Sequence, residues 1–354
     1  MMTPKENYMA VSRGEKPDQI PIYATNMIEF LHFYYDVPIR TLLDDPDIHV
    51  DVTARSVQEF GFDCVVPGIA FILFGCGPEI GVEWEFLGHN LPGTIGGLIN
   101  SEDDISKITI PSSPSGYFFN YIQILSKLNK RIGDTVFVLG FVLGPFSTAC
   151  FLRGIENTML DAVDNVELFK KYIPLCVDFS IHFGKHVLEV GLPTCPLLEI
   201  FVSPDLIGSE YYHKNVAPYD NQVCSHFEKA GLTVPNTYSP FMGNPGDKES
   251  QRVGRDMYDY FWGTKESIEV IRRAIKHSIP GYPGIISMSG RMLVEWSADD
   301  IMDFLKEALN LLVKENQMYP AIRLASLQTA SKEETQDVAE KLKMIIEIAH
   351  SYPL

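Results

Sequence analysis

The chain has 354 residues, of which 45% are hydrophobic, and its 46 acidic and 29 basic side chains give a net charge of −17 at pH 7. This apolar content excludes a disordered chain, because disordered chains cannot bury enough apolar surface to offset the entropy of ordering. The acidic balance, without a cluster of Lys or Arg, argues against nucleic-acid binding through phosphate neutralisation.

The N-terminal residues carry no apolar signal segment, and no window reaches the roughly 18 apolar residues that span a membrane. We therefore expect a cytoplasmic protein without membrane contact. The cysteines are scattered without CxxC spacing, which predicts buried thiols rather than disulfides or a ribbon-type zinc site. They are Cys64, Cys76, Cys150, Cys176, Cys195 and Cys224.

Short apolar runs alternate with longer amphipathic stretches, as in repeated β–α units. The predicted strands are Ile20–Ala24, Asp63–Pro67, Val136–Phe141, Pro196–Phe201, Leu232–Asn236, Tyr258–Trp262, Gly284–Met288 and Ala321–Ser326. The predicted helices are Pro4–Arg13, Ile48–Phe60, Tyr117–Lys130, Val166–Val190, Lys265–His277, Ala298–Val313 and Lys332–His350.

Eight strands that alternate with helices predict an α/β fold, the (β/α)8 TIM barrel, preceded by an N-terminal helix. The doubly wound alternative usually has a GxGxxG turn after its first strand, and this chain has none. We expect residues 1–354 to form a single domain with inserted loops at Phe71–Ser115 and Pro240–Asp256. The first insertion is expected to hold a hairpin near Gly81–Leu87 and to border the mouth of the pocket.

Several stretches form a long ordered pattern. They are MTPKENYMAVSRGEKPDQIPI, LGFVLGPFSTACFLRGIENTMLDAVDNVEL, LLEIFVSPDLIGSEYYHKNVAPY and ISMSGRMLVEWSADDIMDFLKEAL. This pattern, with Gly144-Pro145-Phe146 followed by Gly154 and Asp164-Asn165, resembles the uroporphyrinogen decarboxylase superfamily along the whole chain. The resemblance implies a TIM barrel, in agreement with the strand count.

The decarboxylases of that superfamily carry an Arg-rich RQAGR segment after the first strand and a catalytic Asp after the second. Here the first position reads TNMIEF without a cation, and Gly68 stands near the place of the Asp. The last strand reads LASLQ where the decarboxylases have NLGHG. Decarboxylation of uroporphyrinogen, a step of porphyrin biosynthesis, is therefore the alternative interpretation, because a substrate with many carboxylates needs cations.

The second chemistry that the resemblance implies is methyl transfer to or from a corrinoid. Members that methylate coenzyme M bind zinc through a His-x-Cys pair after the fifth strand and a later Cys, whereas this chain has LTVPNT there and no Cys after Cys224. The remaining branch resembles the first methyltransferases of anaerobic O-demethylase systems. It implies a small methylated donor such as an aryl methyl ether, and a corrinoid-binding partner protein whose Co(I) corrinoid accepts the methyl group.

Other interpretations stay open from the sequence alone. Zinc held by carboxylates and histidines is an alternative that the spacing does not specify, and the chain is compatible with a homodimer. A barrel that binds ligands without catalysis is a third functional hypothesis. His182 and His186 are spaced as i and i+4 on the longest predicted helix, where a packing or surface role is favoured over a metal pair.

Active sites of this fold gather at the C-terminal ends of the strands, so the residues that follow the predicted strands form the candidate site. Such a mostly aromatic set suits a small aromatic or uncharged ligand, and a phenolate leaving group benefits from a proton donor. The predicted catalytic residues are Glu199, Tyr238 and Tyr260, and the predicted substrate contacts are Asn26, Glu29, Phe30, Phe71, Asn236, Trp262, Met288 and Gln328.

Two of these assignments have structural alternatives. Glu199 is also compatible with a hydrogen-bonded carboxylate of the core. Side chains along Tyr258–Trp262 alternate between two faces, so either Tyr260 with Trp262 or their neighbours face the barrel interior.

Overall fold

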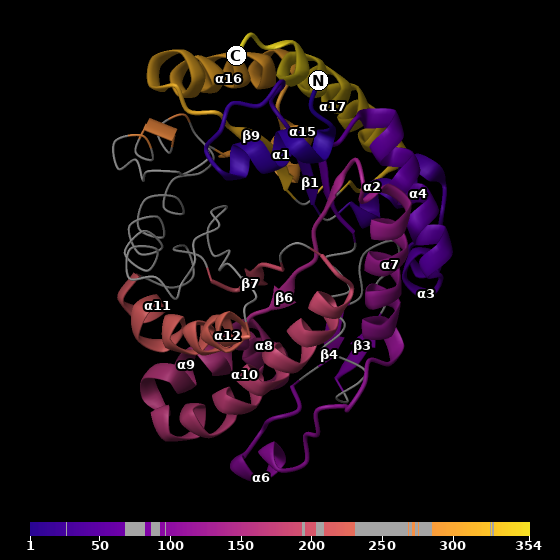
Figure 1. Cartoon of the computed structure of the whole chain (residues 1–354). Helices are drawn as coiled ribbons and strands as arrows, with labels where there is room; N and C mark the ends of the chain where they lie inside the picture. The colour runs from indigo at the N-terminus through magenta and orange to yellow at the C-terminus, as the bar shows by residue number, and fades with distance from the viewer. Residues whose placement is uncertain are drawn as a thin grey trace.

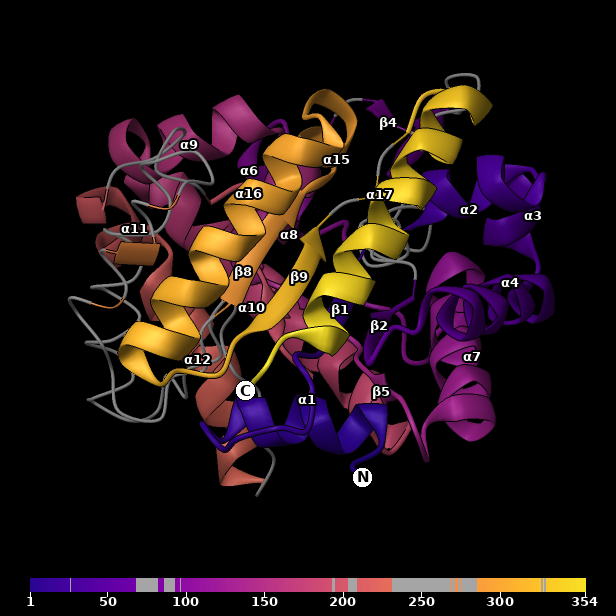
Figure 2. The same cartoon turned by 90° about the horizontal axis from the view of Figure 1, so that it is seen from above.

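The computed structural model of the protein describes residues 1–25, 27–67, 82–85, 93–95, 97–192, 195–202, 209–230, 268, 271, 272, 275, 285–325, 327 and 329–354. Helices form a ring around parallel strands, and α1 lies near the strands' N-terminal ends (Figures 1 and 2). None of the described helices is long and apolar enough to cross a membrane.

The main described sheet has five parallel strands. In spatial order they are β5 (Phe137–Val138), β2 (Cys64–Val66), β1 (Ile22–Thr25), β9 (Ala321–Ala325) and β8 (Ile285–Ser289). The chain continues from β5 into β6 (Val142–Leu143), which pairs in parallel with β7 (Leu197–Leu198). This is the neighbour order of a barrel from the seventh predicted strand through the eighth and first to the fourth.

Gly140 lies where the third predicted strand changes partner. The first half of that segment pairs with β2, and the continuation after Gly140 pairs with β7. A Cβ atom at Gly140 would lie 2.9 Å from the side chain of Val187 and 3.0 Å from that of Leu125. The close approach of two helices therefore requires glycine here.

The helices begin and end at residues with clear local reasons. Thr3 caps the N-terminal end of the helix Pro4–Ser12, because its side chain and that of Glu6 form a capping box. The fourth begins at Asp45, whose carboxylate accepts from two backbone N–H groups, and ends at Gly61 with φ of 75°. The helices are α1 (Pro4–Ser12), α2 (Ile28–Tyr35), α3 (Ile39–Asp44), α4 (Pro46–Phe60), α6 (Glu102–Ile105), α7 (Gly116–Ile132), α8 (Pro145–Arg153), α9 (Ile155–Asp164), α10 (Val166–Glu189), α11 (Ser209–Asn215), α12 (Ala217–Lys229), α15 (Gly290–Glu295), α16 (Ala298–Leu309), the π-helical η2 (Asn310–Glu315) and α17 (Lys332–Ser351).

Most predicted elements are confirmed to within a few residues. The predicted strands Leu232–Asn236 and Tyr258–Trp262 lie outside the described residues, and so does most of the predicted helix Lys265–His277. In the first insertion, β3 (Glu83–Glu85) pairs antiparallel with β4 (Gly93–Ile95), so the pairing extends beyond the hairpin expected at Gly81–Leu87.

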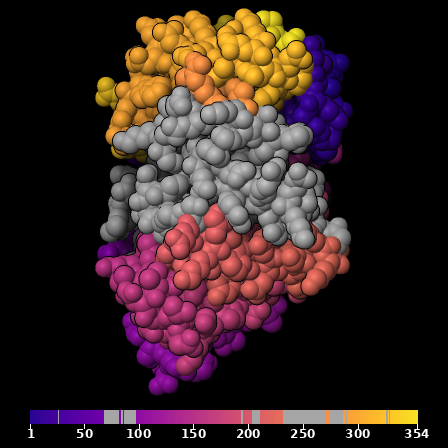
Figure 3. Space-filling model, turned by 90° about the vertical axis from the view of Figure 1, so that its left-hand side faces the viewer, coloured from indigo at the N-terminus to yellow at the C-terminus, as the bar shows by residue number. Residues whose placement is uncertain are grey.

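The described core consists of two apolar clusters. The larger fills the space between the sheet and helices such as α4, α7, α16 and α17. The smaller joins α8, α9 and α10 to Ile99 of the insertion. Figure 3 shows one face of the molecule, with α16 toward one end and α11 and α12 toward the other.

Candidate functional site

Tyr8 of α1 identifies the strand residues that face the barrel interior. Its ring centroid lies 5.8 Å from that of Tyr23 on β1 and 4.8 Å from that of Phe137 on β5. It also interacts electrostatically with the thiol of Cys64 on β2. A single side chain contacts three neighbouring strands in this way only from inside the barrel, so Tyr23, Cys64 and Phe137 point inward.

The strand register extends this interior layer to β9 and β8. Tyr23 pairs with Arg323, and Arg323 pairs with Ser287. Because neighbours in a parallel ladder share a face, Arg323 and Ser287 also face the interior. Asp63 has the opposite phase to Cys64, and its carboxylate lies 3.2 Å from Nε2 of His350 on the outer helix α17.

Met288 and Phe30, two predicted substrate contacts, lie in the apolar core. Met288 pairs with Leu324 on the face opposite Arg323 and is fully buried, so it points toward the helices. Phe30 is also fully buried, and its ring stacks on Tyr34 at 5.2 Å and meets the Phe60 ring at 5.6 Å. The structure does not bring these two side chains into the interior layer.

Glu29, another predicted contact, lies in the first turn of α2, just beyond the end of β1. It is 6% exposed, and its Oε2 atom is buried with no hydrogen-bond partner. Burial raises the pKa of this carboxyl group to about 7, because the charged form loses its hydration.

Glu199 directly follows β7 and is 3% exposed. Its Oε1 accepts from the N–H of Phe146 at 2.8 Å, and its Oε2 accepts from the N–H of Ser147 at 2.6 Å. The Ser147 hydroxyl also donates to Oε2 and accepts from the N–H of Ile200 at 2.8 Å. The carboxylate thus fastens β7 to the N-terminal end of α8, where the helix dipole favours negative charge.

The phase of β7 places Glu199 on the side of the helices. Leu197 pairs with Val142, whose Cγ2 lies 3.1 Å from the Cβ position of Gly184 on α10. Glu199 is two residues beyond Leu197 and so shares that outward face. A Cβ at Gly144 would lie 2.2 Å from the carboxyl carbon of Glu199, so the carboxylate needs a glycine beneath it.

Asp220 on α12 is a second buried acid beside Glu199. It is fully buried, and both carboxyl oxygens lack a hydrogen-bond donor. Burial, and next the charge of Glu199, raise the pKa of Asp220 well above its usual range, so its carboxyl group keeps its proton at neutral pH. Burial also raises the pKa of Glu199, to about 7, while the hydrogen bonds from Ser147 and Phe146 at the start of α8 act in the opposite direction.

The other predicted site residues lie outside the described part of the chain. Their positions relative to the interior layer stay predictions. They are Asn26, Phe71, Asn236, Tyr238, Tyr260, Trp262 and Gln328.

The described cysteines do not fit a thiolate metal site. All five are buried, and burial raises the pKa of each thiol. Within the described ranges, no three His, Cys, Asp or Glu side chains gather as metal ligands. His182 and His186 contact each other on α10 with ring centroids 4.8 Å apart, and His186 hydrogen-bonds Glu189.

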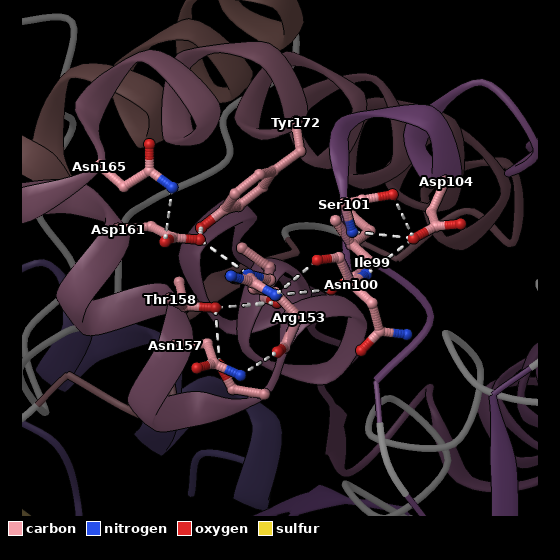
Figure 4. Close-up of polar contacts among 12 residues, drawn as sticks. Ile99, Asn100, Ser101, Asp104, Arg153, Asn157, Thr158, Asp161, Asn165 and Tyr172 are labelled. Carbon is pink, nitrogen blue, oxygen red and sulfur yellow. Dashed lines mark hydrogen bonds and ion pairs between the residues drawn. The ribbon is translucent and has the colours of Figure 1, made fainter.

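Arg153 fastens the first insertion to the barrel (Figure 4). Its Nε donates to Asp161 at 2.8 Å, and its Nη1 donates to the carbonyl of Ile99 at 3.0 Å. Asn165 and Tyr172 also donate to the Asp161 carboxylate, each at 3.4 Å. This cluster sets the insertion against the corner between α8 and α9.

Four polar residues that the structure makes prominent are not among those predicted from the sequence: Arg323, Ser287, Ser147 and Asp220. The sequence does contain a signal for Arg323. It lies between Ile322 and Leu324 in a predicted strand, so alternation places it on the face opposite these two apolar residues. Ser147 lies within the GPFS stretch of the ordered pattern. Asp220 had no local signal, since its partner Glu199 is distant in the sequence.

The family model of uroporphyrinogen decarboxylase (URO-D) matches residues 3–241. This range includes the candidate residues from β1 to α12.

Relatives with two different named activities match the chain. Methylcobamide:CoM methyltransferase MtbA from Methanosarcina mazei is 26% identical over 151 residues, which is 43% of each chain. Uroporphyrinogen decarboxylase from Synechococcus sp. (strain CC9605) is 21% identical over 286 residues, 76% of this chain and 78% of the relative. The chain therefore spans less than half the length of the first of these relatives.

A solved methyltransferase from Methanosarcina mazei superposes with a TM-score of 0.73 at 14% identity, over 98% of this chain and 99% of that chain. At this level of identity the likeness concerns the fold. It confirms the predicted TIM barrel.

Proposed function

Because the chain belongs to the uroporphyrinogen decarboxylase family, we propose that it is an enzyme that moves a methyl group from a small methylated donor to the Co(I) corrinoid of a partner protein. The relatives offer methyl transfer and decarboxylation as the two candidate chemistries. The donor we propose is an aryl methyl ether.

The choice of methyl transfer over decarboxylation rests on the residues that follow β1. The helix that follows, α2, reads IEFLHFYY and contains no Lys or Arg, and its first turn holds the buried Glu29. A porphyrinogen with many carboxylates needs several cations where it binds, and a buried acid without a cation disfavours it. A small donor that does not carry many carboxylates is compatible with this environment.

In the proposed reaction, the Co(I) corrinoid supplies the nucleophile that attacks the methyl carbon. The carbon–oxygen bond breaks, its electron pair stays on the oxygen, and the resulting phenolate takes up one proton. Tyr238 and Tyr260 remain the proposed proton donors. The contacts of Glu199 support a different role, in which it holds β7 and α8 together at the mouth of the barrel.

The test is methylation of cob(I)alamin, followed by its change in absorbance, with a panel of methoxylated aromatic compounds and methylamines. We expect methylation with at least one methoxylated aromatic compound. Failure of the whole panel, together with formation of coproporphyrinogen from uroporphyrinogen, would overturn the proposal.

Uroporphyrinogen decarboxylation is the second candidate. One observation favours it, namely that the alignments with decarboxylases cover about three quarters of this chain, against 43% for MtbA. The porphyrinogen assay described above decides between the two chemistries.

A further inference from the structure

Among the described residues, the interior layer of the barrel contains one cation, Arg323, at the centre of β9. Its guanidinium carbon lies 6.0 Å from the centroid of the Tyr23 ring, on the neighbouring strand. Arg323 and its other neighbour Ser287 are both partly exposed, whereas Tyr23 is buried. Part of each of these two polar side chains is therefore accessible, with N–H and O–H groups that can donate to a small ligand.

No described carboxylate neutralises this cation. The Nε atom of Arg323 is buried without a hydrogen-bond partner, and no ion pair joins the side chain to a described acid. Asp63, the acid before β2, points to the opposite face and accepts from the N–H of Ile22 at 2.9 Å. Burial raises the pKa of Tyr23 and of Cys64, so both neighbours are neutral at pH 7.

A guanidinium cannot lose its proton at neutral pH, so an unpaired one inside a protein is unfavourable until an anion binds it. Its planar fork matches a carboxylate through two parallel hydrogen bonds. We propose that Arg323 binds a carboxylate on the methyl donor. The donor is then a small anion with one acidic group, a proposal that rests on the methyl transfer proposed above and narrows its substrate class.

Two probes that differ only in charge test this proposal. 4-Methoxybenzoate and 4-methoxybenzamide share the ring and the methyl ether, and calorimetry on the full chain measures the binding of each. We expect the carboxylate to bind at least tenfold more tightly to the wild-type protein. The preference should vanish in Arg323→Met and persist in part in Arg323→Lys, which keeps the charge and loses the fork.

Arg291→Met is the matched control, because Arg291 lies on the surface of α15 and pairs with Glu295. It should leave both affinities unchanged. Equal binding of the two probes, absence of binding by the carboxylate, or a preference retained in Arg323→Met would overturn the proposal. So would a fall in melting temperature above about 5 °C in Arg323→Met, because it would show that a protein group pairs with the cation.

The outcomes separate this proposal from the proposed function. Carboxylate binding that depends on Arg323, without methylation of cob(I)alamin by any donor, would support the anion site and refute methyl transfer. Methylation from neutral donors as fast as from carboxylates would refute the anion site and leave methyl transfer standing.

Discussion

At the scale of single residues, the phase of each strand decides which predicted residues can meet a substrate. The sequence of a strand does not show whether the polar or aromatic residue at its end points into the barrel or toward the surrounding helices. Met288 and Arg323 illustrate the ambiguity, since the pairing register turns Met288 outward and Arg323 inward. The strands that the structure describes were predictable from the sequence, but their phase required the contacts of Tyr8.

Glu199→Gln tests the role of the carboxylate at the end of β7. An amide cannot accept from both N–H groups of α8, so we expect a loss of about 2 kcal/mol in the free energy of unfolding. We expect methyl transfer per folded molecule to fall by less than about tenfold, because the side chain faces the helices. Urea unfolding and the cob(I)alamin assay on one preparation measure both.

Glu189→Gln is the control for this substitution, because the Glu189 side chain is 70% exposed on α10, where it pairs with His186. It should change stability by less than about 0.5 kcal/mol. A loss of activity of about 10²-fold in Glu199→Gln at unchanged stability would return Glu199 to catalysis, as predicted from the sequence.

Glu29 predicts a dependence of stability on pH. Its pKa is about 7 in the folded protein against an ordinary value of 4.5, so between these values the folded state holds a proton that the unfolded state has lost. Stability contributed by this group therefore falls as pH rises from 4.5 to 7, by roughly 3 kcal/mol at most.

Glu29→Gln should remove this slope and raise the free energy of unfolding at pH 8 relative to the wild type. Urea denaturation at pH 5, 6, 7 and 8 measures the difference, with Glu156→Gln on the exposed side of α9 as the control. A difference between wild type and Glu29→Gln that is independent of pH would contradict the buried, protonated state.

At the scale of elements, the periodicity of apolar residues was a better guide to the helices than the positions of proline, which usually ends a helix. The predicted helix Val166–Val190 contains Pro174, and α10 runs through it without ending. The third strand was predicted as one segment, but it divides between two partners at Gly140. The local sequence pattern indicates that this segment is a strand. Its change of partner from β2 to β7 depends on residues far away in the sequence.

The Arg153 cluster gives a prediction for the first insertion. Arg153 and Asp161 have side chains only 14% and 7% exposed, so Arg153→Met leaves a buried carboxylate without its cation. We expect a loss of about 3 kcal/mol in the free energy of unfolding. The N–H of Ile99, which donates to the carbonyl of Leu152 at 2.8 Å, should exchange with solvent faster.

Arg153→Met combined with Asp161→Leu should recover part of the loss, because both charges are then absent. Arg131→Met, which breaks an exposed ion pair with Asp51, is the control and should change stability by less than about 1 kcal/mol. Unchanged exchange of the Ile99 N–H in Arg153→Met would show that the apolar contacts alone hold the insertion.

At the scale of the whole molecule, the N-terminal ends of the strands join the two ends of the chain. Asp63 is fully buried and accepts from the N–H of Ile22 at 2.9 Å and from Nε2 of Gln19 at 3.3 Å. On its other side it meets His350, near the end of α17, at 3.2 Å. One carboxylate therefore connects the first strand, the second strand and the last helix, on the barrel face where stability rather than catalysis is expected.

Asp63→Asn keeps the size of this side chain and removes one of its acceptor oxygens. We expect a loss of about 2 to 3 kcal/mol in the free energy of unfolding, because buried hydrogen bonds to a charged group are among the stronger ones. Hydrogen exchange should increase in β1 and α17 together, since the carboxylate contacts Ile22 at the start of the chain and His350 near its end. Asp134→Asn at an exposed turn is the control and should change neither measurement. Faster exchange confined to α17 would mean that the two ends of the chain are held independently, with packing rather than Asp63 joining them.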